Sequence, residues 1–276
     1  MTEEAAWDKL ELARDLRDRG DYAAAVVLYQ EAMTVFTAVS GADSLGVANS
    51  YQGIGNVYQA QGQYTEALEY HQTGLAITIW VLGHDHVNVA ISYNNIGGVY
   101  QAQGQYVEAL ESHQESLAIT IRVLGHDHAD VAGSYNNIGM VYQAQGQYVE
   151  ALEYHQKSLA INILVLGHDH GDVAGSYNNI GMVYSVQGKY AEALEYYQKD
   201  LAITIRVLGH DHVDVATSYN NIGTVYQAQG QYAEALEYHQ KSLAIRIRVL
   251  GHDHVEVADS KYNMAELYVR QDARGW

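Results

Sequence analysis

The chain contains no cysteine and no proline among its 276 residues. Without cysteine it can form no disulfide and offers no thiolate as a nucleophile or metal ligand, a composition that suits the cytoplasm, where we expect the protein to act. Average usage of about 5% would give roughly a dozen prolines. Because proline interrupts helices, its absence favours long, continuous helical segments.

Positively charged residues are also scarce. The 15 Lys and Arg stand against 33 Asp and Glu, so the net charge is −18 with neutral histidine. Nucleic acids and anionic membranes bind basic patches, so we expect neither as a partner, and we expect a neutral or basic protein or peptide in preference to an acidic one. Protonation of all 14 histidines would change the charge from −18 to −4. We therefore expect solubility to depend on pH between about 5 and 7.

Membrane-directed segments are missing as well. The N-terminal stretch is acidic and amphipathic and lacks the apolar segment of a signal peptide. No run of apolar residues approaches the roughly 18 that are needed to cross a bilayer. The sequence therefore predicts a soluble protein.

What the sequence does contain is a repeat of fixed length. The tetrapeptide Gly-His-Asp-His occurs five times at a spacing of 42 residues, starting at Gly83, Gly125, Gly167, Gly209 and Gly251. A period of this length indicates stacked structural units, not a globular core around one pocket. An active site is a single special place, whereas here every residue class recurs in register. We therefore expect no enzymatic activity and no cofactor.

One repeat unit has the pattern of two helices. Apolar residues in 89–103 recur three or four apart, as on one face of a helix, and the same spacing returns in 106–124. Gly104 separates the two segments, and Gly125 follows the second, where glycine can adopt the left-handed conformation that ends a helix. Each unit is therefore predicted to be a helical hairpin, with Gly97 where the two helices approach closely.

The motif Gly-x-x-Tyr, followed by Gln-Gly-x-Tyr-x-Glu-Ala-Leu-Glu-Tyr, resembles the tetratricopeptide repeat, and its 42-residue spacing resembles the longer repeat of kinesin light chains. The resemblance covers nearly the whole chain. It implies an all-α, right-handed superhelical solenoid of about six helical hairpins and a C-terminal capping helix. Residues 1–276 would then form a single solenoid, with a degenerate first repeat at 4–40, five near-identical repeats in 46–250 and the capping helix at 255–271.

Paired asparagines recur on the first helix of four repeats, as Asn94 and Asn95, Asn136 and Asn137, Asn178 and Asn179, and Asn220 and Asn221. An amide side chain offers a donor and an acceptor, which suits the backbone of an extended peptide. The resemblance implies that first helices line a concave groove, and that the peptide contacts come from Asn95, Asn137, Asn179 and Asn221. The alternative is structural, with one asparagine of each pair bridging neighbouring helices.

Other side chains of the first helices are also expected at the groove, namely Gln59, Gln101, Gln143, Gln227, Met140 and Met182. Between Tyr51 and Gly230 these helices carry no Lys or Arg apart from Lys189 in a turn. Clamps for acidic chaperone tails, and kinesin light chains that accept tryptophan-acidic peptides, use basic residues at this place. Both kinds of acidic ligand are therefore disfavoured.

The histidines fall into two sets. Those flanking the loop aspartates could form metal half-sites, at His84, His86, His126, His128, His168, His170, His210 and His212. Equal copies favour a structural role over one special metal site, so we expect no metal and keep metal binding as an alternative. The second set lies on a helix face where Tyr197 stands in one unit, which favours packing over ligation, and comprises His71, His113, His155 and His239.

Together these features predict a non-catalytic scaffold for protein–protein interaction. It would bind an extended peptide or a helix in its concave groove, with affinity summed over many weak contacts. Two alternatives remain: the array belongs to a larger receptor or to a kinesin-light-chain-like adaptor, or its histidine loops bind metal.

Overall fold

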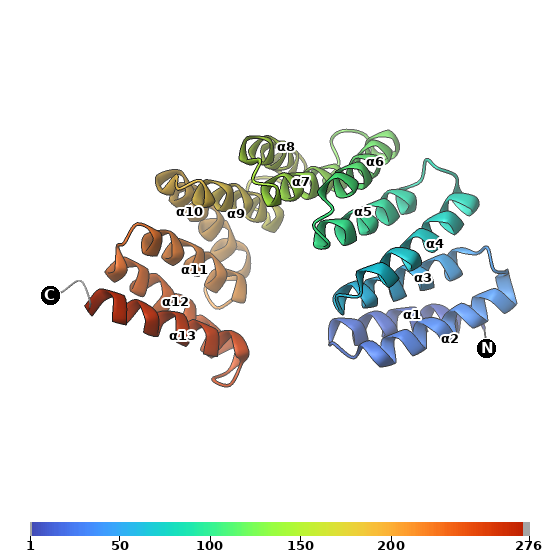
Figure 1. The fold of residues 1–276 in the computed structure, drawn as a ribbon, viewed down its shortest axis with the longest axis horizontal. Coiled ribbons are helices and arrows are strands. Elements are labelled where there is room, and N and C mark those ends of the chain that lie inside the picture. Colours follow the sequence, from blue (N-terminus) through green and yellow to red (C-terminus); the bar gives the residue numbers. More distant parts are fainter. Residues whose placement is uncertain (1, 273–276) are drawn as a thin grey trace. The chain divides into compact units, whose positions relative to one another are not determined.

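The computed structural model describes residues 2–272, which form thirteen α-helices and no strand (Figure 1). The helices are α1 (Glu3–Asp18), α2 (Tyr22–Ser40), α3 (Leu45–Ala60), α4 (Tyr64–Leu82), α5 (Val87–Ala102), α6 (Tyr106–Leu124), α7 (Ala129–Ala144), α8 (Tyr148–Leu166), α9 (Gly171–Val186), α10 (Tyr190–Leu208), α11 (Val213–Ala228), α12 (Tyr232–Leu250) and α13 (Val255–Asp272). Odd-numbered helices are the first helices of the hairpins and even-numbered helices are the second. The predicted all-helical repeat architecture is confirmed.

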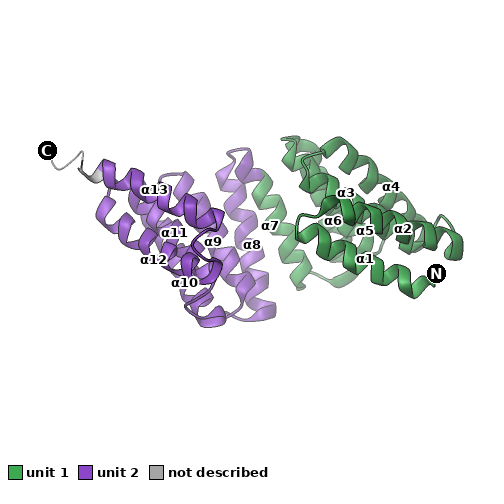
Figure 2. Cartoon of the chain, turned by 90° about the horizontal axis from the view of Figure 1, so that it is seen from below, with its two compact units in different colours: residues 1–141 green, residues 142–276 purple. Residues whose placement is uncertain are grey.

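The chain divides into two compact units, residues 1–141 and residues 142–276, with the boundary inside α7 (Figure 2). Unit 1 contains α1 to α6 and most of α7. Unit 2 contains the end of α7 and α8 to α13. Within each unit, first and second helices pack as hairpins, such as α5 with α6 and α11 with α12.

Two glycines shape the hairpin formed by α5 and α6. Gly104 lies in the turn between the helices at a φ of 74°, and Gly125 follows α6 at a φ of 84°. A side chain is strained in this left-handed region, which explains glycine at both positions. The N–H of Gly125 also donates to the carbonyl of Ile121 at 2.9 Å, which satisfies a carbonyl at the helix end. The predicted turn and helix end are confirmed.

Within each unit, neighbouring hairpins bury apolar residues against each other. In unit 2, Val173 and Ala174 of α9 pack with Ile203 of α10 and with Leu159 and Ile163 of the preceding second helix. One repeat later the same cluster re-forms from Val215, Ala216, Ile245, Leu201 and Ile205. Burial of one such large side chain contributes about 1.5–3 kcal/mol. Because the cluster spans two hairpins, neighbouring repeats stabilise each other.

Helix α2 is the one described helix that is long and apolar enough to cross a membrane, by length and composition alone. The prediction concerned an uninterrupted apolar run, which Gln30 and Glu31 prevent in α2. The helix meets the limit through its length and its mean hydropathy. In unit 1 the helix packs against α1 and α3. Its buried residues include Tyr29 and Phe36, and the Phe36 ring meets Trp7 edge-on at 4.9 Å.

Candidate functional site

Each unit has one or more hollows between its own first helices. In unit 1, the α1–α3–α5 hollow has a volume of about 340 Å³ and the α5–α7 hollow about 200 Å³. Ile91 of α5 borders both, so they form one continuous surface, the first-helix face of unit 1. In unit 2, the α9–α11 hollow has a volume of about 230 Å³. In each hollow, buried side chains of a second helix form the floor, such as Thr78.

The predicted asparagine pairs form hydrogen bonds between helices. The Oδ1 atom of Asn94 accepts a hydrogen bond from Nδ1 of His113, in the same hairpin, at 3.0 Å. It accepts a second one from Nδ2 of Asn137, in the next hairpin, at 2.7 Å. In unit 2, Nδ2 of Asn221 donates to Oδ1 of Asn178 at 2.8 Å. We call this series of contacts the amide ladder, and it confirms the bridging role that the sequence left open.

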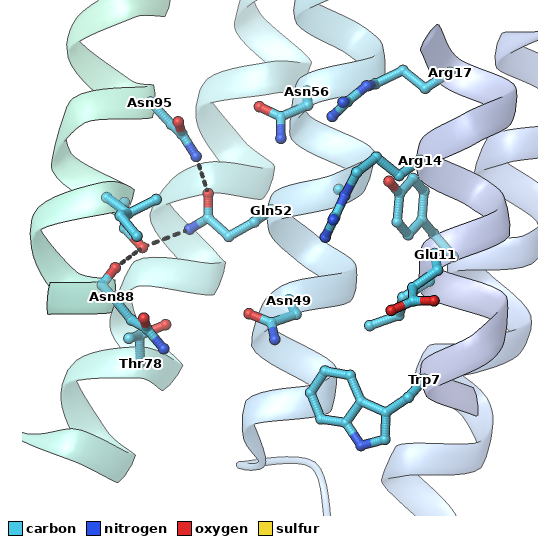
Figure 3. Close-up of a pocket in the computed structure, with 15 residues that line it drawn as sticks. Trp7, Glu11, Arg14, Arg17, Asn49, Gln52, Asn56, Thr78, Asn88 and Asn95 are labelled. Atoms are coloured by element: carbon cyan, nitrogen blue, oxygen red, sulfur yellow. Dashed lines mark hydrogen bonds between the residues drawn. The ribbon is translucent and has the colours of Figure 1, made fainter. Parts of the chain in front are cut away.

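Gln52 stands in for asparagine at the start of the ladder. Its Oε1 atom accepts from Nδ1 of His71 at 2.6 Å and from Nδ2 of Asn95 at 3.3 Å. Its Nε2 atom donates to Oγ of Ser92 at 3.0 Å. Figure 3 shows the Gln52 side chain extending from α3 towards Asn95 of α5. The longer amide replaces the Asn member of the pair without breaking the pattern.

The second set of histidines packs inside the hairpins, as expected. A Cβ atom on Gly97 would lie 2.7 Å from the His113 ring, so the close approach predicted at this glycine is an approach of the histidine to the helix backbone. At Gly181 the neighbour is Tyr197, which takes the same place. With Nδ1 donating to the ladder, Nε2 of His113 is buried without a partner among the described residues.

Burial lowers the pKa of His71, His113 and His155 to about 4. Burial also lowers the pKa of His239, and the positive charge of Arg246 lowers it further. His71, His113 and His155 therefore stay mainly neutral between pH 5 and 7. The expectation that all 14 histidines gain charge in that range is wrong for them.

The structure brings only part of the predicted site residues together at the hollows. Asn95 lines the α1–α3–α5 hollow, Asn94 and Asn137 line the α5–α7 hollow, and Asn178 lines the α9–α11 hollow. The remaining predicted residues line none of the three: Asn136, Asn179, Asn220, Asn221, Gln59, Gln101, Gln143, Gln227, Met140 and Met182. Met140 and Met182 are exposed.

Helix α1 contributes charged side chains that the sequence analysis missed. Arg14 and Arg17 point from α1 towards Asn49 and Asn56 of α3 across the α1–α3–α5 hollow (Figure 3). Arg17 pairs with Asp18 at 2.7 Å, whereas Arg14 forms no ion pair with any described residue. The scarcity of basic residues holds for the first helices between Tyr51 and Gly230, a range that does not include the degenerate first repeat. The spacing of Trp7, Glu11 and Arg14 on one face of α1 was the available signal.

The loop histidines have a structural role. Nδ1 of His86 accepts the backbone N–H of Asn88 at 3.1 Å and caps the start of α5. The same contact, at 3.1 to 3.3 Å, recurs at His128, His170, His212 and His254. The structural role expected of the loop histidines is confirmed for the second histidine of each loop.

The loop aspartates point to neighbouring repeats. Asp85 pairs with Arg122, Asp169 with Arg206, and Asp211 with Arg248. These exposed pairs add little stability. Among the residues that the structure describes, no group of three or more His, Asp or Glu side chains could hold a metal ion. The metal-binding alternative therefore lacks a ligand cluster.

Comparison with known proteins identifies the repeat. The family model described as Tetratricopeptide repeat matches residues 3–79, 53–120, 88–163, 130–199, 172–248 and 214–274. No curated protein matches the sequence. These matches together span nearly the whole chain.

Several solved structures have the same fold. The nearly identical repeats of a putative kinesin light chain from Podosopora anserina are 29% identical, with a TM-score of 0.62 over 74% of this chain and 97% of that one. BtubC (BKLC) from P. vanneervenii is 19% identical, with a TM-score of 0.66 over 91% and 92%. The tetratricopeptide repeat sensor protein of the STAND type from Pyrococcus horikoshii is 17% identical, with a TM-score of 0.68 over 99% and 42%. The chain therefore belongs to the tetratricopeptide repeat family, with repeats of the kinesin-light-chain-like type.

Proposed function

We propose that the protein is a non-catalytic scaffold that binds an extended peptide segment of a partner protein on its first-helix faces. Tetratricopeptide repeat proteins are generally non-catalytic scaffolds that bind proteins or peptides. The observation that carries the proposal is the α1–α3–α5 hollow. There the side chains of Arg14, Asn49 and Asn56 line the space and form no hydrogen bond or ion pair with the described residues.

These free polar groups favour an extended segment over a helix. An extended peptide presents unpaired backbone N–H and C=O groups, and each amide side chain can serve both. A bound helix has already satisfied these groups internally and would leave Asn49 and Asn56 without new partners. Ile91, which is 53% exposed between the two hollows of unit 1, offers an apolar contact to side chains of the same segment.

Positive charge at the α1–α3–α5 hollow adds peptides with an acidic group to the partners that we expect. The lining of this hollow contains two guanidinium groups, Arg14 and Arg17, and one carboxylate, Glu11, all on α1. A carboxylate of the partner would find a guanidinium there without an existing ion pair, in Arg14. The proposed partner is therefore a peptide that places one acidic group at α1, within a segment that need not be acidic elsewhere.

The test uses variants that leave the amide ladder intact. A displayed peptide library is selected on the full-length protein, and the affinity of selected peptides is measured by fluorescence anisotropy. We expect the double variant Asn49→Ala, Asn56→Ala to bind about tenfold more weakly, the effect of losing one or two net hydrogen bonds. Val107→Ala, on the exposed start of α6, is the matched control and should bind like the wild type. Failure to select any peptide, or equal binding by all three proteins, would contradict the proposal.

An adaptor role is the second candidate. It is favoured by the 29% identity to the repeats of a putative kinesin light chain. An adaptor joins two partners, so a ternary complex should form on the chain and be detected by size-exclusion chromatography with light scattering. A role within a larger receptor is supported only by likeness of fold, at 17% identity.

A further inference from the structure

At one position of the second helices, a single repeat carries a side chain of different chemistry. Asp200 of α10 stands where the other repeats have Gly74, Ser116, Ser158 and Ser242. Its side chain is buried, with 5% of its surface exposed. A carboxylate at a buried position is unfavourable unless it is paired or hydrogen-bonded. The substitution therefore requires a physical explanation that the repeat architecture does not supply.

The surroundings of Asp200 supply hydrogen bonds but no positive charge. Oγ of Ser218 donates to Oδ2 at 2.7 Å, and Oγ1 of Thr204 donates to Oδ1 at 3.0 Å. Within the described residues, no Lys, Arg or His forms an ion pair with Asp200. Burial raises its pKa to about 6, the two hydroxyl groups partly oppose this effect, and the nearby carboxylate of Asp214 raises the pKa further. At neutral pH the group is therefore mainly ionised and without a counter-charge.

Asp200 faces an open space instead of a packed core. It lies with Thr204 at the floor of the α9–α11 hollow, whose volume is about 230 Å³. The walls include the small or apolar residues Ala174, Gly175 and Val207, together with the polar residues Asn178, Asp214 and Thr217. A Cβ atom on Gly175 would meet nothing within 4 Å, so the entrance is unobstructed on this side.

We propose that the α9–α11 hollow binds the cationic side chain, lysine or arginine, of a partner peptide, with Asp200 as its counter-charge. Ala174 and Val207 of the walls suit the aliphatic stem of such a side chain, whose charged head reaches the floor. A charge-assisted hydrogen bond to a buried carboxylate is stronger than a neutral one. The inference rests on the proposed function, because it assigns a ligand class to the α9–α11 hollow in the same peptide-binding role.

Unit 1 contains a natural control for this pocket. The α5–α7 hollow has a similar volume, about 200 Å³, and the same framework of two first helices above one second helix. Its floor is formed by Ser116 and Thr120, at the positions of Asp200 and Thr204. The two hollows differ in this carboxylate and in their entrance, where Val87 and Ile91 of unit 1 replace Gly171 and Gly175 of unit 2.

The experiment uses single side chains as probes, so it does not depend on a natural partner. N-acetyl-lysine methylamide, N-acetyl-arginine methylamide and the neutral N-acetyl-norleucine methylamide are titrated into the full-length, isotope-labelled protein. Binding is followed by amide chemical shifts in α9 and α11. We expect saturable shifts at Gly175 and Ser218 with one or both cationic probes, and none with norleucine. The lysine and arginine arms distinguish an ammonium from a guanidinium ligand.

One substitution removes the carboxylate from the α9–α11 hollow, and a second introduces a carboxylate into the α5–α7 hollow. Asp200→Ser restores the residue of three other repeats and should weaken binding of the cationic probe at least tenfold. Ser116→Asp should create saturable shifts at the α5–α7 hollow. Circular dichroism verifies that both variants are folded. The proposal is overturned if the wild type shows no saturable shifts, if norleucine binds equally, or if Asp200→Ser leaves binding unchanged. Any of these results would leave peptide binding in unit 1 untouched, so the two proposals fail separately.

Discussion

The side-chain oxygen of Asn94 lies 2.7 Å from the amide nitrogen of Asn137, which is 43 residues farther along the chain. The same oxygen accepts a hydrogen bond from His113 of its own hairpin. A single carbonyl therefore joins three helices of unit 1. Because this oxygen accepts two hydrogen bonds, its loss should destabilise the protein more than loss of the Asn137 donor alone.

Asn94→Ala should destabilise the protein more than Asn137→Ala. The first substitution leaves two donors, on His113 and Asn137, without their acceptor, and an unsatisfied buried donor costs about 1–3 kcal/mol. The second removes one donor and leaves the His113 contact intact, at a cost of about 1 kcal/mol. Urea unfolding followed by circular dichroism measures both. Asn49→Ala, outside the ladder, is the control, and an equal loss for both ladder variants would contradict the predicted order.

His113 should make the protein sensitive to acid. Its folded pKa is about 4, below the unfolded value near 6.5, so only the unfolded chain takes up a proton in this range. Stability is therefore fully present above pH 6.5 and falls as the pH drops towards 4, by about 3 kcal/mol for this histidine. His113→Tyr copies the residue at Tyr197 and should lose less stability between pH 7 and pH 5.

The control for that experiment is the exposed loop histidine His126. His126→Tyr should lose as much stability between pH 7 and pH 5 as the wild type. Urea unfolding midpoints at the two pH values give the comparison. If His113→Tyr shows the full wild-type loss, burial of the imidazole is not the source of the acid sensitivity.

The contribution of Asp200 to stability should have the opposite pH dependence. Its folded pKa, about 6, lies above the unfolded value near 3.8, so the unfolded chain loses its proton first as the pH rises. The stability contributed by the protonated form is present below pH 4 and is lost as the pH rises through 6. We expect Asp200→Ser to be more stable than the wild type at pH 7, by up to about 3 kcal/mol, and nearly equal at pH 4. A difference of the same size at both pH values would point to packing instead of ionisation.

The two histidines of one loop, His126 and His128, should contribute differently to the free energy of unfolding. His128 caps α7 by accepting the N–H of Asp130, whereas His126 is exposed and forms no hydrogen bond with the described residues. His128→Ala should cost about 1 kcal/mol, as for other helix caps. His126→Ala should stay within about 0.5 kcal/mol of the wild type. Thermal and urea unfolding of the two variants measure the difference directly, and equal losses would contradict a capping role.

The helices and their ends could be predicted from local sequence. Gly104 and Gly125 mark the turn and the end of α6 because a positive φ leaves few alternatives to glycine. The apolar spacing around Val89 and Ile96 likewise predicts a helix face that the structure buries. These features depend on residues near in sequence, so the pattern alone sufficed.

The candidate site was harder to predict because it depends on which helices lie side by side. Nothing local to Asn94 says whether its amide meets a peptide or Asn137 of the next hairpin. Arg14 was overlooked because the first repeat departs from the pattern used to align the others. Asp200 passed unnoticed because a lone acidic residue on a helix resembles a surface residue until its burial is known. In both cases the departure from the repeat was the signal.

The amide ladder also bears on how such arrays grow. Each link joins an asparagine to a partner one repeat and one residue away, so a duplicated cassette of 42 residues brings its own donor and its own acceptor. Insertion or loss of a whole cassette by unequal recombination would therefore leave no orphaned polar group at the junction. The number of repeats can therefore change during evolution while the ladder amides at each repeat junction keep their hydrogen-bond partners.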